Sequence, residues 1–285
     1  GLDALLSYQN YPIIAAQLST EKRRPLGIGI INFAYWMAKN HLSYQNITSE
    51  GLELIDEYAE AWSYYLIKAS ADLALEHGAC PGTMETKYGH GITPNQTYAK
   101  ALDELVPHQE RMDWDGLREQ LKATGIRNST LMALMPSETS AQIANATNGI
   151  EPPRSLISVK QSKHGVLKQV VPEYKRLKNK YDLLWEQRSP EGYIKIVSIL
   201  QKYIDQGVSV NTSYNPTYYE DEKIPMSIML QHMLMFYKLG GKQLYYFNTF
   251  DGQGELDVNS MFESVQQPET NSTPIDDEEC ESCTI

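Results

Sequence analysis

Cysteine is scarce in this sequence. The chain has three cysteines in 285 residues, too few for the disulfide framework that stabilises small secreted domains. Two of them, Cys280 and Cys283, stand close together near the C-terminus. They are therefore candidates for redox or metal chemistry and not for cross-linking of the fold.

Long apolar runs are absent as well. No stretch approaches the roughly 18 apolar residues that a membrane-spanning helix needs, and the first residues lack the basic and then apolar pattern of a secretory leader. The apolar fraction of 41% and the charged fraction of 21% are ordinary for a folded protein. We therefore expect a folded cytoplasmic protein with no membrane partner.

Basic residues are outnumbered by acidic ones. The chain has 25 Lys and Arg against 36 Asp and Glu, for a formal net charge of -11. A nucleic-acid-binding surface needs Lys and Arg clustered on one face, so nucleic acid is not an expected partner. Part of the acidity lies at residues 276–281, around the two terminal cysteines.

Hydrophobic periodicity alternates with short apolar runs of strand length along most of the chain, which favours an α/β fold. Helices are predicted at residues 50–77 with Gly78 as C-cap, 113–125 with Asp113 as N-cap, 172–188, 191–206 and 225–240. Strands are predicted at residues 129–135, 208–212 and 243–248, and a hairpin at 156–171 that turns at 162–165. We expect residues 1–251 to form one domain and residues 252–285 to form a disordered acidic tail.

The segment Met135–Ile143 combines a strand end with a polar helix start. Such a turn presents unpaired backbone N–H groups, here next to the side chains of Glu138, Thr139 and Ser140, and can bind an anion or a phosphate. The alternative is an ordinary N-cap, which is common at helix starts rich in Ser, Thr and Asp.

Two consecutive tyrosines, Tyr245 and Tyr246, lie in the predicted strand 243–248. Adjacent strand residues point to opposite faces, so one ring would normally point inward and the other outward. Taken alone, the pair is explained by β-propensity, because the chain has 19 tyrosines and includes other doublets.

The terminal Cys280-x-x-Cys283 pair could form a redox-active disulfide or half of a zinc site. Zinc would require two more ligands, and no second pair of Cys or Cys and His is present, so we expect no metal site. An exposed terminus suits thiol–disulfide exchange, which needs access for an attacking thiolate. The alternative is two accidental surface thiols, while Cys80 is expected to be structural.

These motifs, in this order, resemble a known family. The similarity extends from about residue 3 to the C-terminus and is carried by Leu26–Tyr35, Arg127–Leu131, Met135–Ser140, Asn145–Arg154, Tyr245–Tyr246 and the two terminal cysteines. The sequence resembles the C-terminal part of the large subunit of class I, aerobic ribonucleotide reductases. The resemblance implies the C-terminal half of a ten-stranded α/β barrel that takes part in the radical reduction of ribonucleoside diphosphates.

The resemblance also implies a role for each candidate residue. Glu138, Thr139 and Ser140 would hold the substrate diphosphate. Tyr245, as the inner member, and Tyr246, as the outer one, would relay an oxidising equivalent. Cys280 and Cys283 match the tail dithiol that re-reduces the active-site disulfide and is itself reduced by thioredoxin or glutaredoxin.

The implied partners supply what the sequence does not contain. The family's radical cysteine is not found in these residues, so we expect it on a separate N-terminal piece of a split large subunit. No cofactor is expected on this chain, since the radical comes from the small subunit's di-iron cofactor.

A second hypothesis is a non-catalytic scaffold or decoy that binds the small subunit. In the family that the sequence resembles, the small subunit's C-terminal peptide binds at the helix that corresponds to residues 225–240. The alternative for this helix is a plain core helix, because its Met and Leu side chains are also typical of cores. The positions concerned are Met226, Met229, Leu230, Met233, Leu234 and Met235.

Overall fold

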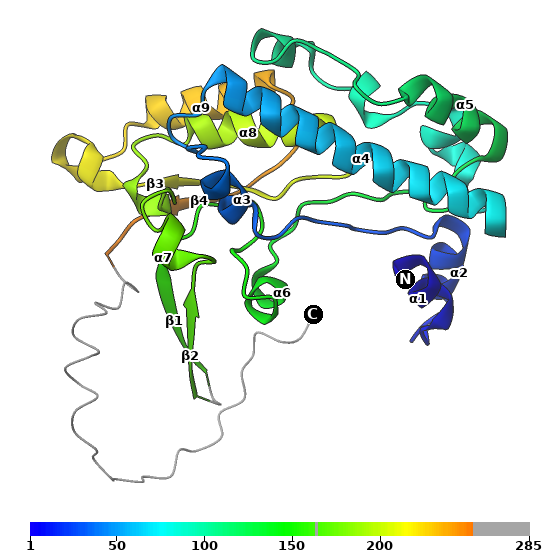
Figure 1. Ribbon diagram of the computed structural model, residues 1–285, viewed down its shortest axis with the longest axis horizontal. Helices are drawn as coiled ribbons and strands as arrows, with labels where there is room; N and C mark the ends of the chain where they lie inside the picture. The colour runs from blue at the N-terminus through cyan, green and yellow to red at the C-terminus, as the bar shows by residue number, and fades with distance from the viewer. Residues whose placement is uncertain (163–164, 253–285) are drawn as a thin grey trace. The chain divides into compact units, whose positions relative to one another are not determined.

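Helices and short strands alternate along the chain (Figure 1). The computed structural model describes residues 1–162 and 165–252. The helices are α1 (Leu2–Tyr8), α2 (Ile14–Arg23), α3 (Phe33–Lys39), α4 (Ser49–His77), α5 (Trp114–Thr124), α6 (Glu138–Ile143), α7 (Tyr174–Leu177), α8 (Glu191–Lys202) and α9 (Met226–Lys238). The strands are β1 (Ile157–Ser162), β2 (Gly165–Val170), β3 (Val210–Tyr214) and β4 (Leu244–Thr249). None of the helices within these ranges has the length and apolar character of a membrane span.

Four extended segments lie side by side in parallel and form the framework of the structure. Ile28 bridges to Met132 and Leu134 bridges to Val208, while β3 pairs in parallel with β4. The predicted strand at 129–135 is thus extended but makes only isolated bridges. The mixed α/β content is confirmed. The sheet does not close within the described residues, and the half barrel stays a prediction.

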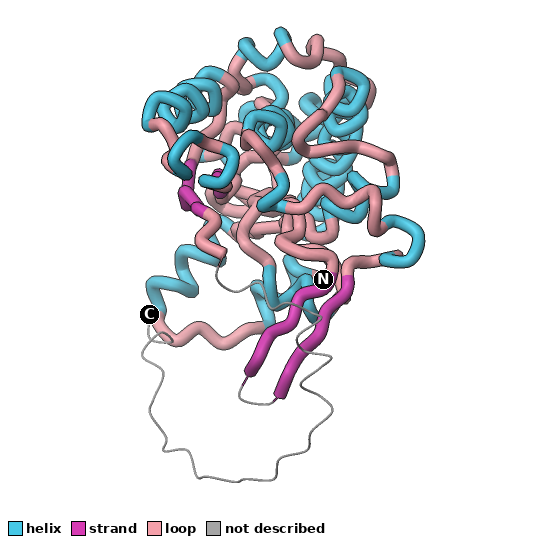
Figure 2. Tube along the Cα trace, turned by 90° about the vertical axis from the view of Figure 1, so that its left-hand side faces the viewer, coloured by secondary structure: helices cyan, strands magenta, loops and turns pink. Residues whose placement is uncertain are grey.

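Alternating side chains give this framework two different faces. In β3 the side chains of Val210, Thr212 and Tyr214 are buried, whereas Asn211 and Ser213 are only half-buried. Figure 1 shows α4, α8 and α9 on one side of β3 and β4, and the β1–β2 hairpin and α6 on the other. The view in Figure 2 agrees, with the hairpin projecting away from the main group of helices. The polar face is therefore turned away from the main helical layer.

Capping residues set the ends of the long helices, and the sequence predicts two of them, Gly78 and Asp113. The side chain of Thr48 accepts a hydrogen bond from the N–H of Gly51 at the start of α4, and Gly78 ends this helix at a φ of 82°. Asp113 caps α5 in the same way, by accepting from the N–H of Gly116. Both helix predictions are confirmed, because a cap is specified by residues within a few positions of it.

The predicted helix at residues 172–188 is wrong. Only α7 and a 3₁₀ turn, Leu184–Glu186, are helical in this range. Tertiary hydrogen bonds replace helical ones: the N–H of Leu184 donates to the carbonyl of Pro153, at 2.9 Å, and the Tyr181 hydroxyl donates to Pro172, at 2.8 Å. Helix α8 also ends earlier than predicted, at Lys202, whereas the hairpin β1–β2 is confirmed.

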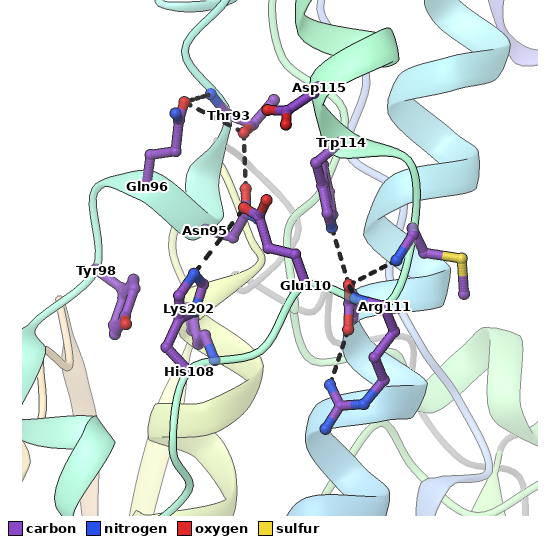
Figure 3. A network of polar contacts seen from close by, with 12 residues as sticks. Thr93, Asn95, Gln96, Tyr98, His108, Glu110, Arg111, Trp114, Asp115 and Lys202 are labelled. Atoms are coloured by element: carbon purple, nitrogen blue, oxygen red, sulfur yellow. Dashed lines mark hydrogen bonds and ion pairs between the residues drawn. The ribbon is translucent and has the colours of Figure 1, made fainter.

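A buried network of charges joins α4 to α8 and to the segment before α5. Figure 3 shows Arg111, Trp114 and Lys202, which belong to it. The α4 carboxylates of Asp56 and Glu60 have no exposed surface. Glu60 accepts from the Trp114 indole, at 2.9 Å, and from the Arg111 guanidinium, at 2.8 Å. Lys202 of α8 donates to Asp56 at 2.8 Å. Each buried charge therefore has partners of opposite charge or hydrogen-bond donors, which such burial requires.

This network yields a stability prediction. Lys202→Met should lower the free energy of unfolding by about 3 kcal/mol, because it deprives the buried Asp56 carboxylate of a cationic partner. The control is Lys122→Met, which removes an exposed ion pair with Glu119 and should cost no more than about 0.5 kcal/mol. Urea unfolding followed by circular dichroism measures both changes, and equal losses would contradict the assignment.

Candidate functional site

A cavity of about 640 Å³ opens on the polar face of the framework. Its wall is built from the ends of the extended segments and from the loop that follows α6. The side chains and backbone that line it include Ile30, Met135, Glu138, Asn148, Glu151, Arg154, Ser209, Asn211, Tyr246 and Asn248. Residues that are more than two hundred positions apart in the sequence thus share one cavity.

The predicted phosphate-binding residues begin α6 at the edge of this cavity. Glu138 lines the cavity, while Thr139 and Ser140 are exposed and follow it in the first helical turn. Ser137 occupies the N-cap position, but its side chain makes no capping hydrogen bond. Among the described residues, the N–H groups of Thr139 and Ser140 have no acceptor. The ordinary side-chain cap is therefore not formed here, and these two donors can bind an anion.

The two predicted relay tyrosines are in ring contact. The ring centroids of Tyr245 and Tyr246 are 4.3 Å apart with an interplanar angle of 61°, and both side chains are about half exposed. Tyr246 lines the cavity, whereas Tyr245 is not among the lining residues. The hydrogen bond with the Tyr245 hydroxyl raises the pKa of Tyr246, which favours its neutral form.

A β-bulge brings the two rings together. Val210 pairs with Leu244 and Asn211 pairs with Tyr246, which leaves Tyr245 as the extra residue on β4. An extra residue of this kind interrupts the strict alternation of side chains and redirects one of them. This explains how neighbouring strand residues touch, although regular alternation would point them to opposite faces.

Glu151 is a site residue that was not predicted from the sequence. Its carboxylate lines the cavity and accepts a hydrogen bond from Asn211 Nδ2 at 2.7 Å. Burial raises the pKa of Glu151, while the Asn211 hydrogen bond and the charge of Arg154 act in the opposite direction. A single Glu before two prolines has no local pattern that marks it as functional. Only its position close to the predicted phosphate-binding motif could have suggested it.

Helix α9 exposes one apolar face. The side chains of Met226, Leu230, Met233 and Leu234 are 42–75% exposed, and His232 and Phe236 are buried on the opposite side. The alternative of a plain core helix is therefore wrong for these four positions. Met229 and Met235 are half-buried.

The remaining candidates carry less structural information. Cys280 and Cys283 lie outside the described residues. Cys80 is buried, and burial raises the pKa of its thiol, as expected for a structural cysteine. Within the described ranges, no three His, Cys, Asp or Glu side chains are grouped so that they could hold a metal ion.

The raised pKa of Glu151 predicts an unusual pH dependence. The folded chain holds this proton more tightly than the unfolded chain, so the Glu151 contribution to stability is fully present below the unfolded pKa and is lost as pH rises through the folded pKa. Glu151→Gln retains an acceptor for Asn211 but has no proton to lose, so its stability does not fall for this reason as the pH rises. The stability of the variant relative to the unmodified protein should therefore increase with pH across this window. Melting temperatures between pH 4 and pH 8 measure the difference.

The control for this experiment is Glu57→Gln on the exposed surface of α4, which removes a carboxylate that water already solvates. Its stability difference should not grow with pH. A Glu151→Gln curve parallel to that of the control would contradict the assignment.

Comparison with known proteins identifies the family. The model of the ribonucleotide reductase barrel domain matches residues 1–247. The chain is 53% identical over 256 residues to the ribonucleoside-diphosphate reductase subunit alpha of Haemophilus influenzae, covering 90% of this chain and 34% of that protein. It is 52% identical over 247 residues to ribonucleoside-diphosphate reductase 1 subunit alpha of Escherichia coli, covering 87% and 32%, and 43% identical over 259 residues to the subunit alpha of Enterobacteria phage T4, covering 90% and 34%.

The chain thus spans about a third of the length of the curated relatives that it matches. The matched range includes the start of α6, the tyrosine pair and every residue that lines the cavity except Asn248. The chain belongs to the ribonucleotide reductase barrel-domain family.

Proposed function

We propose that this chain supplies part of the catalytic site of a ribonucleoside-diphosphate reductase, in which ribonucleoside diphosphates are reduced to deoxyribonucleoside diphosphates by radical chemistry. One observation carries the proposal: a single cavity is lined by both Glu138, at the start of α6, and Tyr246. A cavity of about 640 Å³ is also within the range of small-molecule sites. The names of the curated relatives support the same activity.

The substrate diphosphate binds at the first turn of α6 in this proposal. The N–H groups of Thr139 and Ser140 and their hydroxyls provide donors for the phosphate oxygens. Glu138 cannot bind phosphate with a charged carboxylate, so we assign its contribution to its backbone and to the cavity wall.

Tyr245 and Tyr246 relay the oxidising equivalent in this proposal. Each phenol gives up one electron and one proton to become a neutral radical, and recovers both from the next donor in the path. Ring contact at 4.3 Å supports transfer between the two phenols. The equivalent originates at the small subunit's di-iron radical cofactor and ends at a cysteine that is not among these 285 residues.

The terminal dithiol closes the redox cycle. Cys280 and Cys283 give two electrons and two protons to the active-site disulfide and become a disulfide themselves. Thioredoxin or glutaredoxin then reduces this disulfide.

The apolar face of α9 supports docking of the small subunit, because an exposed cluster of Met and Leu side chains is typical of an interaction surface. A decoy that merely binds the small subunit could use the same face. It would have no use for a tyrosine pair in contact beside a substrate-sized cavity, so we favour the catalytic role.

Supplying the N-terminal residues of the large subunit as a separate polypeptide tests the prediction of a split subunit. Turnover should appear only when this chain, that polypeptide and the small subunit are all present. Turnover with this chain and the small subunit alone would refute it.

Tyr245→Phe tests the relay in a reductase reconstituted from this chain, the N-terminal large-subunit residues and the small subunit. Phenylalanine keeps the ring but cannot release a proton and an electron at an accessible potential. Turnover should fall at least about a thousandfold, while substrate binding and subunit assembly are retained. Tyr65→Phe is the matched control, because Tyr64 and Tyr65 form another doublet in ring contact on α4. Unchanged turnover of Tyr245→Phe would exclude the relay.

Replacement of both Cys280 and Cys283 by serine tests the tail dithiol. Turnover driven by thioredoxin should be lost, since the shuttle cannot form, whereas turnover driven by a small dithiol that enters the site directly should remain. Steady-state assays with the two reductants measure this difference. Equal losses with both would refute the shuttle, and Cys80→Ser serves as the control for a cysteine outside the tail.

A further inference from the structure

Asn211 stands at the β-bulge that brings the two tyrosines together. It is the residue of β3 that pairs with Tyr246, immediately after the register shift between Val210 and Asn211. The ladder is interrupted at this point, because Tyr245 has no residue opposite it on β3. Side-chain hydrogen bonds therefore matter more here than in a regular strand.

Both ends of the Asn211 amide are used. Its Oδ1 accepts from the backbone N–H of Tyr246 at 3.2 Å, and its Nδ2 donates to the Glu151 carboxylate at 2.7 Å. The Tyr246 N–H can only donate and the ionised carboxylate can only accept, so a flipped amide would lose both bonds. Glu151 thereby fixes the amide, and the amide holds the backbone of Tyr246.

We propose that Asn211, oriented by Glu151, is a positioning residue that holds the Tyr245–Tyr246 pair in ring contact. The proposal rests on the tyrosine relay proposed above and extends it to two residues that would neither carry the radical nor transfer its proton. Glu151 and Asn211 also line the cavity that contains Tyr246. The same pair of side chains therefore links the cavity wall to the strand that carries the relay.

Several groups face the Glu151 carboxyl from neighbouring elements. Arg154, on the same loop, stabilises the charged form of Glu151. The charge of Glu151 in turn contributes to the raised pKa of two buried phenols, Tyr44 and, on α8, Tyr193. Glu138 of α6 lines the same cavity. Among the described residues, Arg154 is the cationic side chain that acts on Glu151. Its single positive charge would not balance the negative charges of two neighbouring carboxylates.

Asn211→Asp is the first test. The new carboxylate keeps the acceptor for the Tyr246 N–H but places a second acceptor against Glu151. The two carboxylates can share the site without repulsion only when one of them holds a proton. In the reconstituted reductase, kcat should fall at least about tenfold at neutral pH and recover as the pH is lowered, with the KM for the ribonucleoside diphosphate unchanged.

The second test exchanges the two functional groups. In the double variant Asn211→Asp with Glu151→Gln, the introduced amide can donate to the second oxygen of the introduced carboxylate. The hydrogen bond is thereby restored with its direction reversed, and the net charge of the pair is preserved. The kcat and its pH profile should return to within about threefold of the unmodified reductase.

The controls separate this inference from the relay and from a merely structural effect. Asn46→Asp makes the same substitution at an exposed site and should leave kcat and its pH profile unchanged. Melting temperatures and small-subunit binding show whether each variant is folded and assembled. If Tyr245→Phe keeps its turnover, the relay itself is wrong.

If Tyr245→Phe abolishes turnover but Asn211→Asp retains the normal kcat and pH profile, the relay stands and the positioning role is overturned. The positioning role is also overturned if the fall in kcat of Asn211→Asp parallels a loss of folded protein. It is overturned as well if the double variant does not restore kcat.

Discussion

Two carboxylates inside helix α4 constrain how the helices and the strand framework fit together. Asp56 and Glu60 are one turn apart and have no exposed surface. Transfer of such charges from water costs several kcal/mol each, so the fold is stable only when their partners are in place. Those partners are Lys202 at the end of α8, its C-cap residue Tyr203, and Arg111 in the segment before α5. The network therefore fixes the register of α4 against both neighbours.

The residues that follow α8 also connect the helices to the extended segments. Asp205 follows Tyr203 by two residues, and its carboxylate accepts from the N–H groups of Leu131 and Met132, at 2.7 and 2.9 Å. Burial raises the pKa of Asp205 even though these hydrogen bonds and that of the Tyr88 hydroxyl favour its charged form. The end of α8 and the segment leading to Met135 are thus held together, which sets where the cavity wall begins.

Local sequence signals predicted the elements that depend on local interactions. Helices α4 and α5 were predicted together with the caps Gly78 and Asp113, because these residues act within a few positions of the helix ends. The β1–β2 hairpin was predicted for the same reason. The segment 172–188 was not, because its backbone bonds to Pro153 and its buried Tyr181 are tertiary interactions that periodicity does not report.

The site was only partly predictable for a related reason. The proposed phosphate-binding turn at Glu138 and the tyrosine doublet are short motifs, and the resemblance singled out both. The contact between the two rings depends on a one-residue difference in register between strands that are about 35 positions apart, which neither segment specifies alone. Glu151 and Asn211 are 60 positions apart and became recognisable only from their hydrogen bond.

The path from the apolar face of α9 to the tyrosine pair is short along the chain. Helix α9 ends at Lys238 and β4 begins at Leu244, with Gly240 and Gly241 between them. A Cβ at Gly241 would lie 2.2 Å from the Phe236 ring, so this turn can pack against the buried side of α9 only as glycine. The helix and the strand are consequently joined by a tight connection and not by a compliant loop. A partner that docks on the exposed face of α9 would bind the element that directly anchors the strand of Tyr245 and Tyr246, the pair that we propose receives an oxidising equivalent from that partner.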